Sequence, residues 1–307
     1  MIKKYKISVP KSTLNNIYKK VRNFPWSATQ NMNGWEYGTN LNYLKSISKY
    51  WITKYNWKKF ENKINSFKNY KTKVEDINLH FIFEKSKNPK SKPLLLLHGW
   101  PGSITEFLDI IPRLAHPEKF GGKIEDGFDI IVPSLPGFGF SSQIKKALGP
   151  RKIGKILNKF MVKNLGYKNY FVQGGDWGAT IAGWIGLDSS KNCKGIHINC
   201  LPLRHPKGTI NIKERKWEKK FNFDQIMQEG YRTQQATKPQ TLSYAMIDSP
   251  VGTAAWILEK FHGWSDLKMG KIEKTFSKDE LLSNIMIYII TKSFNTCLLY
   301  TSDAADE

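Results

Sequence analysis

The apolar positions of the chain follow two different periods. In residues 1–75 they recur at helical spacing, as in L-N-N-I-Y-K-K-V (14–21) and L-N-Y-L-K-S-I-S-K-Y (41–50), which predicts amphipathic helices. Between these helices lies a stretch rich in Trp and Gly, residues 24–38. We expect this loop to pack onto another part of the molecule.

Residues 76–203 show a different pattern, in which strand and helix signals alternate. Most of the strand-like runs are apolar on both faces, which predicts a mostly parallel sheet covered by helices and therefore an α/β fold. The predicted strands lie within residues 77–84, 93–100, 128–135, 170–174 and 195–201. Residues 204–296 carry few strand signals and begin directly after a strand, so we expect a helical cap and then the start of a return to the core.

The composition excludes several classes of protein. Forty per cent of the 307 residues are hydrophobic, as in a folded globular protein. No run of 18 apolar residues and no apolar leader is present, so we expect neither a membrane span nor a secretory signal. Three cysteines without metal-ligand spacing suit a reducing compartment, and a cytoplasmic location is expected.

The net charge of +22 raises the question of a nucleic-acid partner. Only six of the 48 basic residues are Arg, however, and the lysines are scattered along the chain. Base readout and bidentate phosphate contacts favour Arg. We therefore interpret the charge as a solvated lysine surface and expect no nucleic-acid partner.

The stretch Q-G-G-D-W-G-A-T (173–180) stands between a predicted strand and a predicted helix. Gly174-x-Asp176-x-Gly178 at this place is typical of a nucleophile elbow, a strained turn that exposes its central side chain. An aspartate N-cap in a glycine turn is the ordinary alternative. A second element, H-G-W-P-G (98–102), follows the predicted strand upstream. The backbone N–H groups of Trp100 and Trp177 would then form an oxyanion hole, and His98 is expected to be structural.

An aspartate at the elbow is suited to displacement at an alkyl carbon, because the product is an ester of its own carboxyl group. Epoxide opening also needs an acid, for which Tyr231 in G-Y-R-T-Q-Q-A-T is the candidate. Phe107 and Phe138, with the two tryptophans, suggest an apolar substrate pocket for a lipophilic or aromatic epoxide. This chemistry needs no metal or organic cofactor, and none is expected.

A set of motifs distributed along the chain resembles epoxide hydrolases of the microsomal type, up to about Asn295. They are F-P-W, N-G-W-E-Y-G, L-H-G-W-P-G-S, P-S-L-P-G-F-G-F-S, G-G-D-W-G, G-Y-R-T-Q-Q-A-T-K-P-Q-T-L and D-S-P-V-G-T-A-A-W-I-L-E-K-F. The resemblance implies an α/β-hydrolase fold in which residues 1–75 wrap the core (76–203) and the cap (204–296). It also implies that Asp176 is the nucleophile and that Tyr231 is one of two cap tyrosines that protonate the epoxide oxygen.

The family pattern goes on after the cap with the second tyrosine, two further strands, an acid and a general-base histidine. The six histidines of this chain are residues 80, 98, 116, 197, 205 and 262; His262 is not expected to be the base. The last eleven residues, 297–307, resemble a translated sequencing adapter, so we treat them as foreign and do not assign Tyr300 as the second acid. We expect the last core strands to be missing, the chain to be prone to aggregation, and turnover to be very slow or single.

Two other functions fit parts of the pattern. A haloalkane dehalogenase-like hydrolase shares the aspartate elbow, but Tyr231 and residues 1–75 argue against it. A non-catalytic scaffold that binds ligands or partners fits the absent histidine.

Overall fold

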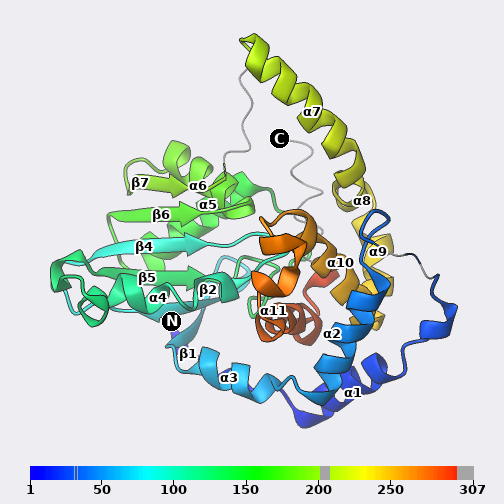
Figure 1. The fold of residues 1–307 in the computed structure, drawn as a ribbon. Helices are drawn as coiled ribbons and strands as arrows, with labels where there is room; N and C mark the ends of the chain where they lie inside the picture. Colours follow the sequence, from blue (N-terminus) through cyan, green and yellow to red (C-terminus); the bar gives the residue numbers. More distant parts are fainter. Residues whose placement is uncertain (31, 33, 201–207, 296–307) are drawn as a thin grey trace.

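The structure, a computed structural model, describes residues 1–30, 32, 34–200 and 208–295 (Figure 1). His205, Cys297, Tyr300 and the adapter-like tail 297–307 lie outside the described residues. The sequence expectations for those positions therefore remain predictions.

One seven-stranded sheet, in the order β1-β2-β3-β5-β4-β6-β7, forms the centre of the molecule. The pairs β5·β4, β4·β6 and β6·β7 are parallel, whereas β1·β2, β2·β3 and β3·β5 are antiparallel. The α/β-hydrolase fold is confirmed, with a mixed sheet in which four neighbouring strands are parallel. The strands are β1 (Lys3–Lys4), β2 (Asn69–Val74), β3 (Ile77–Glu84), β4 (Lys92–Leu97), β5 (Phe128–Pro133), β6 (Tyr170–Gly174) and β7 (Cys193–Ile198).

Two strands, β1 and β2, lie in the segment 1–75 for which the pattern predicted helices and a loop. β2 joins the sheet through a tight hairpin with β3, in which Val74 pairs with Ile77 and Glu75 adopts φ 55°. A positive φ in a two-residue connection is what this type of hairpin requires. The N-terminal segment thus extends the sheet as well as covering it.

Helices cover both faces of the sheet. Helix α6 (Trp177–Asp188) packs along β4, β6 and β7 together with α5 (Pro150–Lys159), which continues into a π-helical turn, η5 (Phe160–Asn164). On the other face, α4 (Ile111–Ala115) packs on β3 and β5. Strand β7 is the last of the described strands at its side of the sheet, and Ile196 on it is 45 % exposed.

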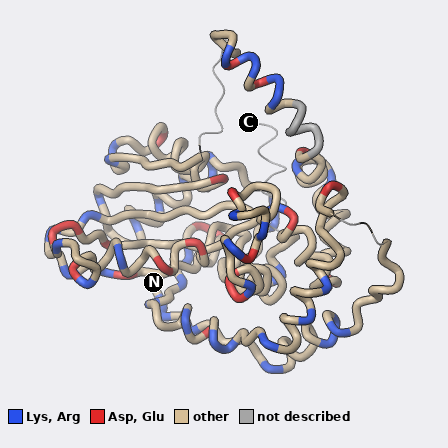
Figure 2. The backbone as a smooth tube through the Cα atoms, in the orientation of Figure 1, with Lys and Arg blue, Asp and Glu red and all other residues tan. Residues whose placement is uncertain are grey.

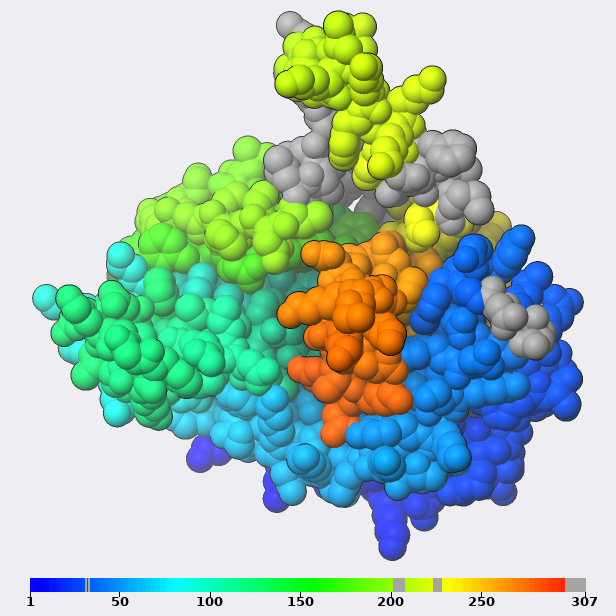
Figure 3. Space-filling view, in the orientation of Figure 1, coloured from blue at the N-terminus to red at the C-terminus, as the bar shows by residue number. Residues whose placement is uncertain are grey.

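The N-terminal helices pack against the last two helices of the described chain (Figures 1 and 3). Helix α2 is amphipathic and begins after Asn40, whose side chain accepts from the backbone N–H of Tyr43 at 2.9 Å. These helices are α1 (Lys11–Arg22), α2 (Leu41–Thr53) and α3 (Trp57–Asn65); the cap helices are α7 (Ile212–Gln228), α8 (Gly230–Thr237), α9 (Pro239–Asp248), α10 (Pro250–Gly263) and α11 (Lys278–Thr291).

Helix α11 is the most enclosed of the cap helices. It begins with a capping box between Ser277 and Glu280, and the eight residues from Leu281 to Tyr288 are all buried. A helix that is buried all round belongs to the interior of a protein. α11 packs between α2, α3, α10 and the short 3-10 helix η2 (Ile104–Phe107) that follows β4.

Positive charge is spread over the molecule instead of forming one stripe. Lysine and arginine occur on the N-terminal helices, the sheet strands and the cap alike (Figure 2). Helix α7 projects away from the rest of the described chain (Figures 1 and 3) and carries exposed Trp217. In the part of the chain that the structure describes, no helix is long and apolar enough to cross a membrane.

Candidate active site

Asp176 occupies a strained turn between β6 and α6. Its φ of 50° and ψ of −126° are unusual for a residue with a side chain. The turn is possible because glycines stand on either side of it. A Cβ on Gly174 would collide with the backbone of Gly178, and a Cβ on Gly178 would collide with the carbonyl oxygen of Leu97 on β4. The strand and helix can approach this closely only with glycine at both positions.

Two backbone N–H groups hold the carboxylate of Asp176. The N–H of Trp100 donates to Oδ1 at 2.8 Å, and the N–H of Trp177 also donates to the carboxylate. The loop after β4 comes so close that a Cβ on Gly99 would collide with Asp176 Oδ1. The two amides predicted to form an oxyanion hole therefore meet at one carboxylate.

The surroundings of Asp176 act on its ionisation in opposite directions. The residue keeps solvent-accessible surface, yet protein atoms surround it densely. Loss of hydration raises the pKa of the carboxyl group, and this is the largest effect; the hydrogen bonds from Trp177 and Trp100 lower it. The net pKa lies above the ordinary value for aspartate.

Tyr231, at the start of α8, lies within an aromatic cluster above the elbow. Its ring stacks on Trp100 with centroids 5.4 Å apart and planes at 9°, and it contacts Trp264 at 5.0 Å. Burial, followed by the charge of Asp176, raises the pKa of the phenol to about 12. The phenol is thus protonated at neutral pH and close enough to Asp176 to respond to its charge.

A buried lysine lies beside this cluster. Lys260 on α10 is 5 % exposed, pairs with Glu259, and places its Nζ 4.4 Å from the centroid of the Tyr231 ring. A cation over an aromatic face is an attractive contact. Sequence reasoning did not single out Lys260, although it stands in the quoted motif W-I-L-E-K-F.

The two phenylalanines predicted to line a pocket are both buried. Phe107 lies on η2 and is 8 % exposed. Phe138 is 1 % exposed and contacts the rings of His98 and Tyr288 edge-on, at 5.3 and 6.4 Å. Their role in substrate binding stays a prediction.

Two histidines of the described chain were considered for the site, His98 and His262, and each is held by packing or hydrogen bonds away from Asp176. His98 is buried, its Nε2 accepts from the N–H of Leu135 at 3.1 Å, and burial lowers its pKa to about 4. His262 stacks on Trp35 of the N-terminal segment, with centroids 3.8 Å apart. Neither arrangement is that of a base aimed at Asp176.

Glu106 is a second carboxyl group near Asp176 that sequence reasoning missed. It lies against Gly102, at which a Cβ would collide with Oε1, and it receives a backbone hydrogen bond from Ser103. The side chain keeps exposed surface, yet protein atoms surround it densely; the resulting loss of hydration, and next the charge of Asp176, raise its pKa to about 8. The signal that could have found it is its place in the same loop, H-G-W-P-G-S-I-T-E, eight residues after His98.

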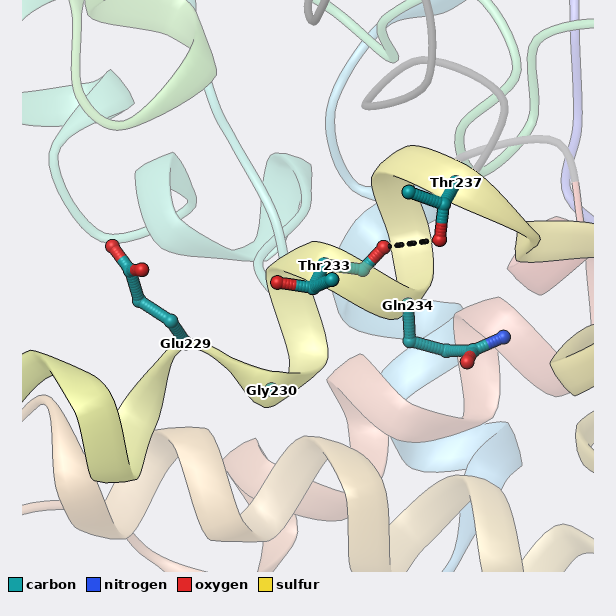
Figure 4. Close-up of a pocket in the computed structure, with 5 residues that line it drawn as sticks. All are labelled: Glu229, Gly230, Thr233, Gln234 and Thr237. Carbon is teal, nitrogen blue, oxygen red and sulfur yellow. Dashed lines mark hydrogen bonds between the residues drawn. The ribbon is translucent and has the colours of Figure 1, made fainter.

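A hollow of about 470 Å³ lies elsewhere, on helix α8 (Figure 4). It is lined by Glu229, Gly230, Thr233, Gln234 and Thr237. Its lining includes neither Tyr231 nor any residue of the elbow, so we place the chemistry at Asp176. Among the described residues no group of three or more His, Cys, Asp or Glu is placed to hold a metal ion.

Comparison with known proteins gives two family matches. Residues 2–107 match the epoxide hydrolase N terminus, and residues 92–246 match the alpha/beta hydrolase fold. The chain is 36 % identical over 322 residues to epoxide hydrolase 1 of Oryctolagus cuniculus, covering 95 % of this chain and 70 % of that protein. It is 33 % identical to juvenile hormone epoxide hydrolase 1 of Ctenocephalides felis, covering 97 % of this chain and 68 % of that protein.

Among solved structures, the juvenile hormone epoxide hydrolase from the silkworm Bombyx mori matches with a TM-score of 0.88. The identity is 31 %, and the match covers 99 % of this chain and 77 % of that one. Across the curated relatives, the chain spans between 61 and 70 % of their length.

Proposed function

This chain belongs to the epoxide hydrolase family, and from that premise we propose that its elbow opens an epoxide by nucleophilic attack of Asp176. The observation that carries the proposal is the position of that carboxylate. It stands on a strained turn, with the N–H of Trp100 2.8 Å from Oδ1 and the ring of Tyr231 stacked on that of Trp100. Asp176 Oδ1 accepts from the N–H of Trp100, so we propose that the second oxygen, Oδ2, is the one that attacks.

In the first step Oδ2 of Asp176 forms a bond to one epoxide carbon, and the bond from that carbon to the epoxide oxygen breaks. The oxygen takes the proton of Tyr231, which becomes a phenolate. The product is a hydroxyalkyl ester of Asp176. A tyrosine is suited to this step because an alkoxide is a poor leaving group unless it is protonated.

In the second step water adds to the ester carbon of Asp176, and the N–H groups of Trp100 and Trp177 stabilise the developing oxyanion. The ester bond then breaks and releases a vicinal diol. A base must accept the proton of the water. None of the histidines at positions 80, 98, 116, 197 and 262 is described in such a position, so we expect this 307-residue polypeptide to accumulate the ester and release it slowly.

The substrate class follows from the rings around the site. Trp100, Tyr231 and Trp264 form a cluster of aromatic rings in mutual contact beside the residue whose N–H bonds the carboxylate. We therefore propose a lipophilic or aromatic epoxide as the substrate.

The test is to incubate the chain with styrene oxide and measure its intact mass over time. We expect one added epoxide per chain, located on Asp176 by peptide mapping, and no addition to Asp176→Ala. A non-catalytic scaffold predicts an unchanged mass for both proteins. Many rapid turnovers by this chain would contradict the expected accumulation of the ester.

A further inference from the structure

The loop after β4 is held from behind by helix α11, by groups that the proposed chemistry does not use. Asn284 Nδ2 donates to the carbonyl oxygen of Pro101 at 2.7 Å, and Tyr288 Oη donates to that of Gly102 at 2.6 Å. Asn284 is 2 % exposed and Tyr288 is 1 % exposed. These carbonyls belong to the two residues directly after Trp100.

Fixing two successive carbonyls restricts the rotation of the peptide units that follow Trp100. The N–H of Trp100 is one residue away and must stay 2.8 Å from Asp176 Oδ1 to make its hydrogen bond. Hydrogen bonds weaken steeply when distance and angle depart from these values. Because Asn284 and Tyr288 are buried, removing either side-chain donor takes away the hydrogen-bond partner of a carbonyl in the interior.

Helix α11 is in turn fixed by the N-terminal segment. Tyr55 Oη and Ser283 Oγ lie 3.1 Å apart in the interior, and Tyr50 Oη donates to Asp279 Oδ1 at 2.9 Å. Ser283 is adjacent to Asn284 in the sequence. A continuous set of contacts therefore runs from the N-terminal segment through α11 to the loop and to Asp176.

We propose that Asn284 and Tyr288 are positioning residues, which hold the loop 99–102 so that the N–H of Trp100 meets the carboxylate of Asp176. The N-terminal segment takes part by fixing α11. The expected effect on the rate of ester formation rests on the proposed function. The expected effect on the position of the Trp100 N–H does not.

The kinetic test compares Tyr288→Phe and Asn284→Ala with the unchanged full chain. Misplacing a catalytic group by about 1 Å can cost on the order of 100-fold in rate. We expect the rate of ester formation at saturating styrene oxide to fall about 10- to 100-fold, with little change in the epoxide concentration that gives half the maximal rate. Loss of folding alone would instead lower the fraction of chain that reacts.

A matched control is available in Tyr170→Phe. Tyr170 is 0 % exposed, and its hydroxyl donates to Asn158 Oδ1 at 2.7 Å at the far end of β6 from the elbow. This substitution removes a hydroxyl that donates one hydrogen bond from the same ring type, in a part-buried position. We expect it to lower stability without changing the rate of ester formation.

A second measurement separates this inference from the proposed function. In ¹⁵N-tryptophan spectra of the unchanged chain, the chemical shift of the Trp100 backbone amide should change with pH as Asp176 titrates. This change in chemical shift should be smaller in Tyr288→Phe and Asn284→Ala but not in Tyr170→Phe. If no epoxide adds to the unchanged chain, the proposed function is wrong. The Trp100 amide signals still test whether Asn284 and Tyr288 position the loop. Unaltered Trp100 signals and unaltered rates in both variants would overturn the inference.

Discussion

Tyr231→Phe removes one hydroxyl group from the proposed site and leaves its packing in place. The phenylalanine ring can keep the stacking on Trp100, whose centroid lies 5.4 Å away, and the contact with the Lys260 ammonium 4.4 Å from the ring. The variant therefore tests proton donation rather than the shape of the cap.

The magnitude follows from the role of the hydroxyl. With its pKa raised to about 12, the phenol of Tyr231 is protonated at neutral pH, which is the form that a general acid requires. General acid catalysis contributes about 10²- to 10⁴-fold. At about 1.4 kcal/mol per tenfold change, this is about 3 to 5 kcal/mol in activation free energy. We expect the rate of ester formation on Asp176 to fall by that factor.

The assay is quenched-flow mixing with styrene oxide, followed by intact-mass measurement of the ester. Tyr244→Phe is the control, since Tyr244 is 67 % exposed on α9 and its hydroxyl bonds only Gln240 among the hydrogen bonds described for it. Urea unfolding of both variants checks that stability is unchanged. A Tyr231→Phe rate within about threefold of the control, well below the range expected for a general acid, would mean that the epoxide oxygen is protonated from elsewhere.

Two further predictions concern the elbow and its neighbouring carboxyl group. Gly178→Ala places a methyl group against the Leu97 carbonyl, so the free energy of unfolding in urea should fall by about 1–3 kcal/mol. The control Gly183→Ala, on the open side of the same helix, should raise the free energy of unfolding by up to about 1 kcal/mol. Equal effects of the two substitutions would refute the steric argument. The pKa of Glu106 is raised from 4.5 to about 8, so between these pH values the folded state retains a proton that the unfolded state loses. The contribution of this group to the free energy of unfolding is therefore fully present below pH 4.5 and is lost as the pH rises through 8. The urea midpoint of the unchanged chain should therefore fall relative to Glu106→Gln across that interval, and a constant difference would show that Glu106 does not titrate there.

The fold was predictable where the apolar runs are long. The strands that became β3 to β7 all show as apolar or alternating runs, and the elbow follows from local backbone requirements at Gly174 and Gly178. β1 has two residues and carries no pattern, and β2, N-Y-K-T-K-V, is a strand because it pairs with β3. Strand direction was also hidden, because the antiparallel pairing of β3 with β5 joins segments far apart in the sequence.

The site was predictable only as far as its motifs are local. Asp176, Trp100 and Tyr231 are candidates from short patterns, and the structure brings the first two into hydrogen-bond contact. Asn284 and Tyr288 lie within the mostly apolar run L-L-S-N-I-M-I-Y. That pattern predicts a buried helix but does not indicate a role for its polar side chains. Only the three-dimensional contact with the loop, more than 180 residues earlier, reveals a partner for each.

The arrangement of charge bears on how a carboxylate can serve at an elbow that protein atoms surround densely. In the reaction we propose, Asp176 must be ionised to attack, but loss of hydration raises its pKa. The amides of Trp100 and Trp177 oppose this shift, so their positions affect the fraction of active nucleophile as well as the oxyanion. Glu106 would add a second negative charge, yet its own raised pKa keeps it largely neutral at pH 7. A neutral Glu106 leaves Asp176 as the charged carboxyl group of the pair, and α11 bears on that charge through the loop 99–102, which carries the N–H of Trp100.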